Sequence, residues 1–196
     1  MSPTENELVI FDLGNVIVRN IEILKTVAAG LGVDCGRLEA DYRKYENAMM
    51  AGLISVQDYY RRLEHIFSVQ LHDDVFRTAF RPVINAPVLE LADRLRAKGQ
   101  RCVIGSNTFS SHWPFIDEMG IRSHFDNAYA SHEIHAVKPY EAFFALIMFR
   151  EGFPAERTHF IDDSPANVAA AAAMGIDAYC YDDDDAALFR HFSCLI

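Results

Sequence analysis

Short apolar segments rich in β-branched and aromatic residues alternate along the chain with longer segments whose apolar residues recur at helical spacing. The short segments predict five buried strands, at residues 7–12, 101–105, 125–130, 158–161 and 178–181. Helices are expected between them, each followed by a glycine, at residues 87–98, 140–151 and 165–174. This alternation predicts an α/β fold: a Rossmann-like parallel sheet with helices on both faces.

The segment 21–80 breaks the alternation, because it contains several helical patterns and no convincing strand. A capping-box pattern, Ser55 followed three residues later by Asp58, predicts the start of one of these helices. We therefore expect a core of residues 1–18 and 82–196, with an all-helical cap subdomain inserted at 19–81. Since the insertion follows the first strand, the cap should hang over the carboxyl edge of the sheet, where open α/β folds bind ligands.

Length and charge narrow the possible functions. A chain of 196 residues can hold one main domain and a modest insertion. Its formal net charge of −10, without a basic stripe, argues against binding to nucleic acid or to an anionic membrane surface. Residues 1–7 lack the layout of an export signal, and no apolar run approaches the roughly 20 residues that span a bilayer. We expect a cytoplasmic protein, monomeric or homodimeric, whose four scattered cysteines have no functional role.

Polar residues stand at or after the ends of four predicted strands: Asp12, then Ser106 and Asn107, then Lys138, then Asp162 and Asp163. Each alone is compatible with a turn or a helix cap; we expect one helix to begin at Ser106 and Pro139 to lie in the first turn of the next. Together they mean more, because the carboxyl ends of parallel strands meet at one edge of a sheet. The sequence therefore predicts one pocket containing carboxylates, a hydroxyl, an amide and a lysine.

These four motifs resemble, in order and spacing, those of the haloacid dehalogenase-like (HAD) hydrolase superfamily with a helical C1-type cap. They are residues 11–16 (FDLGNV), 105–107 (GSN), 138–139 (KP) and 161–163 (IDD) with Asn167. In the cap, residues 52–55 (GLIS) resemble a short segment found in many four-helix caps. The first motif is similar to that of a bacterial branch that includes α-D-glucose-1-phosphate phosphatase.

The resemblance implies a magnesium-dependent phosphatase that hydrolyses a small phosphate monoester through an aspartyl-phosphate on Asp12. By resemblance, Mg²⁺ is held by the carboxylates of Asp12 and Asp163 and by the carbonyl of Gly14. A phosphate monoester is nearly a dianion, so a carboxylate can attack it only if cations offset the repulsion. The two aspartates add two negative charges, and Mg²⁺ with Lys138 returns three positive ones.

The same resemblance gives roles to the other motif residues. Ser106 and the backbone N–H of Asn107 are expected to hold phosphoryl oxygens, while Lys138 neutralises the charge of the transition state. Asp162 and Asn167 are expected to lie behind them and to orient Lys138 or a metal-bound water.

Gly14 departs from the pattern, because most phosphatases of this superfamily have an aspartate there that protonates the leaving oxygen and later activates water. General acid–base catalysis is worth about 10² to 10⁴ in rate, so we expect a slow enzyme or one that prefers good leaving groups, such as a sugar 1-phosphate. A water or a cap residue could substitute, although packing or a surface position is the simpler interpretation of each cap candidate: Tyr42, Tyr45, Glu46 and His65.

Two features near the third motif have simpler interpretations. His132 and His135 could line the pocket, but a surface position is the simpler expectation. Tyr140-Glu141 follows the motif where relatives often have an acid directly after the proline, and we expect only a local consequence.

Two other functions remain open. A metal-independent 2-haloacid dehalogenase also lacks the second acid of the first motif, but it would be expected to have small polar groups in place of Asp162-Asp163. The other is a catalytically weak member that binds a phosphorylated metabolite or a partner protein through its cap. The joint presence of Asp12, Ser106, Lys138 and Asp163 favours turnover.

Overall fold

The structure is a computed structural model and describes residues 6–196. Most of the segment 1–7, on which the expectation about export rests, lies outside the described residues. Five strands form a parallel sheet, as predicted, in the order β5 (Asn127–Ala130), β4 (Arg101–Ser106), β1 (Leu8–Phe11), β6 (Thr158–Asp162) and β7 (Asp177–Cys180). β1 lies at the centre, where Phe11 is in register with Ile104 on one side and Ile161 on the other. The sheet thus brings the carboxyl ends of β1, β4 and β6 together.

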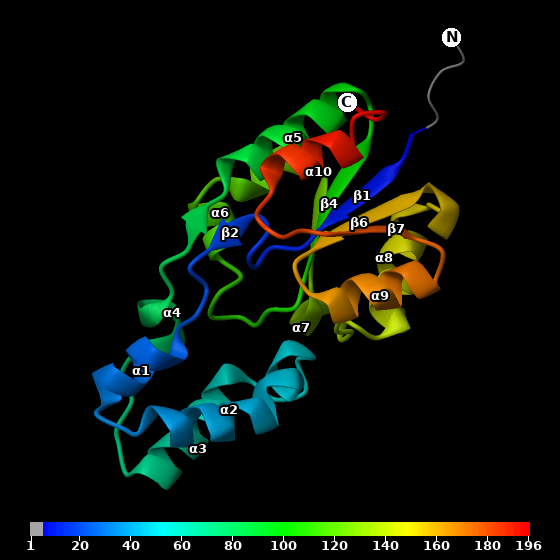
Figure 1. The fold of residues 1–196 in the computed structure, drawn as a ribbon. Helices are drawn as coiled ribbons and strands as arrows, with labels where there is room; N and C mark the ends of the chain where they lie inside the picture. The colour runs from blue at the N-terminus through cyan, green and yellow to red at the C-terminus, as the bar shows by residue number, and fades with distance from the viewer. Residues whose placement is uncertain (1–5) are drawn as a thin grey trace.

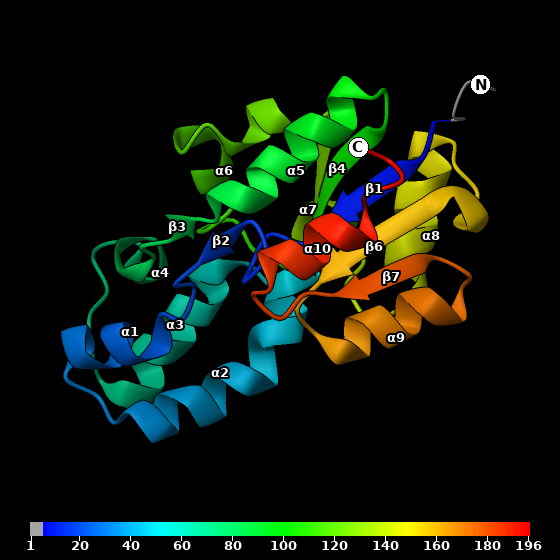
Figure 2. The same ribbon diagram turned by 45° about the horizontal axis from the view of Figure 1, so that its top comes forward.

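Helices cover both faces of this sheet (Figures 1 and 2). On one face lie α5 (Ala86–Ala97) and α10 (Asp185–His191), and on the other α8 (Glu141–Glu151) and α9 (Pro165–Ala173). Side chains alternate along β1: Val9 and Phe11 pack with α5, whereas Leu8 and Ile10 pack with α8. Because both faces are buried, the strand is apolar at every position and places the following residue rigidly.

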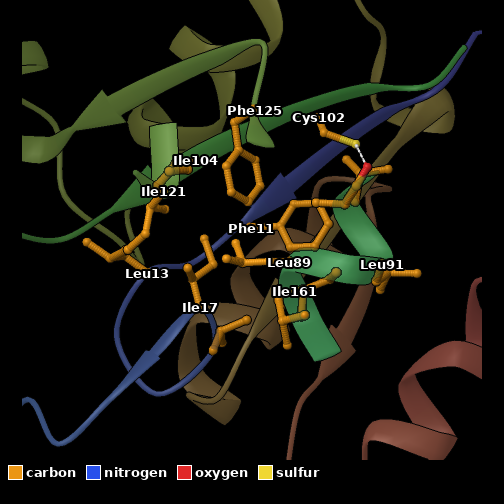
Figure 3. Packing of buried hydrophobic residues seen from close by; sticks show 14 of the residues in the cluster. Phe11, Leu13, Ile17, Leu89, Leu91, Cys102, Ile104, Ile121, Phe125 and Ile161 are labelled. Atoms are coloured by element: carbon orange, nitrogen blue, oxygen red, sulfur yellow. Dashed lines mark hydrogen bonds between the residues drawn. The ribbon is translucent and has the colours of Figure 1, made fainter. Parts of the chain in front are cut away.

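Figure 3 shows the first of these clusters from close by. The rings of Phe11 and Phe125 meet edge to face, with centroids 5.3 Å apart, and Leu89 and Leu91 of α5 close the cluster. Burying side chains of this size stabilises a fold by about 1.5–3 kcal/mol each, so the strand that carries Asp12 is firmly anchored.

The predicted helical insertion is confirmed. It contains α1 (Leu24–Leu31), α2 (Cys35–Met50), α3 (Val56–Phe67) and α4 (Val75–Ala79), which pack around the buried rings of Tyr59 and Phe76. The capping box opens α3, with the hydroxyl of Ser55 accepting from the backbone N–H of Asp58 at 3.0 Å. Figure 1 shows these helices beyond the carboxyl edge of the sheet.

Two short strands that the sequence pattern did not predict join the cap to the core. β2 (Val18–Arg19) pairs antiparallel with β3 (Val83–Ile84), so the segment that enters the cap and the segment that leaves it run side by side. The division expected at residues 18/19 falls inside β2, and the one at 81/82 lies one residue before β3. A pairing only two residues long leaves too little alternation to be recognised in a sequence.

Several local expectations were wrong. No helix begins at Ser106; a loop follows β4, and α6 (Phe115–Glu118) comes later. Pro139 precedes Tyr140, the N-cap of α8, and is not in the helix. The reason is tertiary: Asn107 and the N–H of Thr108 bond to residues after β5 instead of capping a following helix. The short helices α7 (Ser131–Ile134), η1 (Ile121–His124) and η2 (Ala155–Arg157) also went unpredicted.

Among residues 6–196, no helix combines the length and the apolar character that crossing a membrane would require.

Candidate active site

Asp12 follows β1 directly and is held at both its backbone and its side chain. Its N–H donates to the carbonyl of Ile161 at 2.9 Å, and its carboxylate Oδ1 accepts from the N–H of Leu13 at 2.7 Å. The same oxygen lies 2.7 Å from Nζ of Lys138. Burial raises the pKa of Asp12 to about 7, against the opposing charge of Lys138. A cation bound at this carboxylate would favour its ionised form.

Lys138 is buried between two carboxylates. Its Nζ lies 2.7 Å from Oδ2 of Asp162 as well as from Asp12, and its side chain is 1% exposed. Burial alone would lower the pKa of Lys138, but the charges and hydrogen bonds of the two aspartates outweigh it and raise the pKa. The site therefore holds a fixed ammonium group next to Asp12.

Asp162, the last residue of β6, is fully buried and positions this lysine. Its Oδ1 accepts from the backbone N–H of Ser164 at 2.8 Å and from Nδ2 of Asn167 at 3.0 Å, while Oδ2 accepts from Lys138. Four hydrogen bonds, including a second one from Asn167 at 3.1 Å, fix its orientation. Asp162 thus contacts Lys138 directly, and Asn167 contacts Asp162.

The third aspartate faces the same point. One carboxylate oxygen from each of Asp12, Asp162 and Asp163 lies within 4.8 Å of the others. Asn15 donates from Nδ2 to Oδ2 of Asp163 at 2.9 Å and so orients it. Carboxylate oxygens at this spacing suit a hard cation such as Mg²⁺, and Lys138 offsets one of their three negative charges. The residues present fit a magnesium site.

Ser106 is the last residue of β4 and Asn107 follows it, and their side chains differ in their hydrogen bonds. The Ser106 hydroxyl is buried, and its one hydrogen bond is a long contact of 3.5 Å to the carbonyl of Asn107. The Asn107 side chain instead holds the backbone of Lys138, through two hydrogen bonds of 2.9 Å. The sequence analysis missed this role, because the local sequence does not indicate which distant group a side-chain amide will bond to.

A cavity of about 840 Å³ lies between the cap and the core; its lining includes Leu13 and Gly14, which follow Asp12, but not Asp12, Lys138 or Asp163 themselves. Gly14, Ser106 and Asn107 line it from the core, and Tyr42 and Glu46 are among the residues of the cap that line it. The two other cap candidates, Tyr45 and His65, are not part of this lining: Tyr45 lies under the guanidinium of Arg62, and His65 is exposed. Lys25, Glu39 and Arg43 line the cavity although the sequence analysis had not singled them out.

The two histidines before Lys138, His132 and His135, do not line the cavity. Each instead contacts a backbone carbonyl of another segment. His132 Nδ1 lies 3.2 Å from the carbonyl of Thr108, and His135 Nδ1 lies 3.1 Å from the carbonyl of Ala51 in the cap. The second contact crosses from α7 to the end of α2, so it holds the cap against the core.

Comparison with known proteins agrees with this arrangement. Residues 7–175 match the family of haloacid dehalogenase-like hydrolases. This match covers most of the chain, and the chain belongs to that family.

Individual relatives resemble parts or all of the chain. The GMP/IMP nucleotidase YrfG of Escherichia coli (strain K12) is 29% identical over 101 residues, which is 51% of this chain and 45% of that protein, so the match spans about half of each. Among solved structures, a predicted HAD-like family hydrolase from Porphyromonas gingivalis is 27% identical, with a TM-score of 0.79 over 95% of this chain and 98% of that one.

An aspartate-to-alanine variant of a HAD family enzyme from Bacteroides thetaiotaomicron, solved in complex with magnesium and inorganic phosphate, gives a TM-score of 0.82. It is 24% identical and covers 94% of this chain and 100% of that one. At this identity the similarity shows that the two chains share a fold.

Proposed function

We propose that this chain is a magnesium-dependent phosphatase that hydrolyses a small phosphate monoester through an aspartyl-phosphate on Asp12. The observation that carries the proposal is the position of Asp12, 2.7 Å from a buried lysine and within 4.8 Å of two further carboxylates. The enzyme from Bacteroides thetaiotaomicron, which shares the fold, was solved with magnesium and phosphate, and this supports the same chemistry here. We also propose the division into a core of residues 1–18 and 82–196 and a cap of residues 19–81.

Each site residue has a role in this reaction. Asp12 attacks phosphorus in line with the leaving oxygen, and Lys138 stabilises the charge that develops on the phosphoryl group. The Ser106 hydroxyl and the backbone N–H of Asn107 hold phosphoryl oxygens. Asp162 and Asn167 act as positioning residues, because Asp162 bonds to Lys138 and Asn167 bonds to Asp162.

Asp12, Asp163 and the carbonyl of Gly14 would hold Mg²⁺, which when bound neutralises the repulsion between the phosphate dianion and the nucleophile. Without it, Lys138 alone faces the negative charges of the aspartates and of the substrate. The carboxylate of Asp163 thus favours a phosphatase over a metal-independent 2-haloacid dehalogenase, whose substrate carries less charge and needs no such group.

For the substrate we propose a sugar 1-phosphate or a similar phosphorylated metabolite. Its anomeric oxygen is a less basic leaving group than an ordinary alkoxide, which suits a site with glycine at position 14. A nucleoside monophosphate is the second candidate, because the relative YrfG is a GMP/IMP nucleotidase by name. A cavity of about 840 Å³ has room for either.

The test is phosphate release from sugar phosphates, nucleoside monophosphates and an aryl phosphate with Mg²⁺, for the natural chain and for Asp12→Asn. We expect release by the natural chain, and its loss in EDTA and in the variant. If the two proteins are indistinguishable on every substrate, the chain is not a phosphatase and the non-catalytic binding function becomes the better hypothesis. Full activity in EDTA would favour metal-independent chemistry.

A further inference from the structure

Gly14 has no side chain that could act as a general acid, and Ile21 packs against it. A Cβ added at Gly14 would lie 2.8 Å from Cδ1 of Ile21. Both residues line the cavity, so the apolar Ile21 covers the backbone beside Asp12. A proton donor for the leaving oxygen must therefore come from another wall of the cavity. The need for such a donor rests on the proposed phosphatase function.

Three carboxylates share the cavity with Gly14 and Ser106: Glu22, Glu39 and Glu46. Two of them lie on one face of α2, since Glu39, Arg43, Glu46 and Met50 recur at spacings of three and four residues and all line the cavity. This face of α2 is thus a wall of the cavity.

Glu46 differs from the other two in its surroundings. Glu22 is exposed, and Glu39 already accepts a hydrogen bond from the thiol of Cys35, with 3.4 Å between sulfur and oxygen. Glu46 is half-buried, and this burial raises its pKa despite the hydroxyl of Tyr42 and the charge of Arg43. Its protonated form is therefore favoured relative to that of a solvated glutamate.

Glu46 also lies near the end of α2 that touches the core. The carbonyl of Ala51 lies 3.1 Å from Nδ1 of His135, and Gly52 packs against the backbone of His132. Lys138 follows this same segment of the core by three residues. Glu46 precedes Ala51 by little more than one helical turn, whereas Glu39 is about 10 Å further along the helix axis.

We propose that Glu46 is the general acid of this enzyme, delivering the proton that a residue at position 14 would otherwise supply. As the bond from Asp12 to phosphorus forms, the bond from phosphorus to the leaving oxygen breaks, and that oxygen takes the proton of Glu46. A water then attacks the aspartyl-phosphate, gives a proton to the Glu46 carboxylate, and releases inorganic phosphate. Asp12 and Glu46 both return to their starting states.

The experiment compares Glu46→Gln with the natural chain on two substrates that differ in leaving group. Glycerol phosphate leaves as a basic alkoxide and needs a proton, whereas p-nitrophenyl phosphate leaves as a stable phenolate and does not. We expect Glu46→Gln to lower kcat/KM at least about 100-fold for glycerol phosphate and to change it less than about threefold for the aryl phosphate. Retained aryl phosphatase activity also shows that the variant is folded.

Glu39→Gln is the matched control, because it removes a carboxylate from the same helix face and cavity. It should leave the ratio of the two kcat/KM values unchanged. Equal losses on both substrates in Glu46→Gln, or no loss on glycerol phosphate, would overturn the assignment of Glu46. A natural chain that is inactive on every phosphate ester would instead mean that the phosphatase proposal itself is wrong.

Discussion

The Asn107 side chain holds both backbone polar groups of Lys138: Nδ2 donates to the Lys138 carbonyl and Oδ1 accepts from its N–H, each at 2.9 Å. One amide thereby ties the end of β4 to the loop that carries the buried ammonium group. The second motif thus sets the position of the third, and the Lys138 side chain reaches Asp12 from a fixed backbone.

This relationship predicts that Asn107→Ala lowers both stability and activity. The variant leaves two backbone groups of Lys138 without their partner, which costs about 1–3 kcal/mol, and Lys138 moves relative to Asp12. Thermal unfolding and kcat on the best substrate measure the two effects. Asn107→Asp should be intermediate, because it keeps the acceptor for the Lys138 N–H and loses the donor. An Asn107→Ala protein with unchanged kcat would show that the hydrogen bonds from Asn107 do not position Lys138 for catalysis.

A second prediction concerns the orientation of Asp163 by Asn15. The backbone of Asn15 has a φ of 56°, which glycine adopts without strain, so Asn15→Gly removes the amide and leaves the loop conformation accessible. Losing a partner that orients a metal ligand typically costs 10- to 100-fold in metal affinity. We expect the Mg²⁺ concentration for half-maximal activity to rise by about tenfold or more. Superimposable Mg²⁺ titrations of the two proteins would show that the Asn15 contact is incidental.

Cap docking can be separated from backbone strain with two glycines. Gly52 and Gly32 both have positive φ, 67° and 66°, so alanine costs about 1–2 kcal/mol at either position. Of the two, only Gly52 would bring the new Cβ into a clash with the core, at the carbonyl of His132; at Gly32 no described atom lies within 4 Å. Both variants should unfold at lower temperature, and only Gly52→Ala should lower kcat/KM. Equal kcat/KM values would mean that this contact does not matter for turnover.

His112 predicts a pH dependence of stability. Burial lowers the pKa of His112 from 6.5 to about 4, against the charge of Asp74. Between these pH values the unfolded chain binds a proton at His112 that the folded chain does not. The contribution of His112 to the free energy of unfolding is therefore fully present above pH 6.5 and is lost as the pH falls towards 4.

His112→Phe keeps the stacking on Phe80, where the ring centroids are 4.0 Å apart, and removes the titrating group. We expect the free energy of unfolding of the variant to fall by about 1–3 kcal/mol less than that of the natural chain between pH 6.5 and 4. Urea titrations at the two pH values measure this difference. His65→Gln, at an exposed position of α3, is the control and should follow the natural chain.

The sequence by itself determined the layered core and the helical insertion. Apolar runs such as Leu8–Phe11 have no solvent-facing position, and this requires a strand buried on both faces of a sheet. In such a sheet the residues at or directly after the carboxyl ends of β1, β4 and β6 meet at one edge, so the convergence of Asp12, Ser106 and Asp162 could be predicted from order alone.

Only the tertiary structure decided how these residues are used. Asn107 bonds to Lys138 across 31 positions, Ile21 fills the space beside Gly14, and one face of α2 lines the cavity while Tyr45 of the same helix packs under Arg62. Local patterns report which residues prefer a strand, a helix or a turn. The partner of a buried polar group depends instead on where segments distant in sequence come to rest, because each such group must find a hydrogen bond wherever the packed chain offers one.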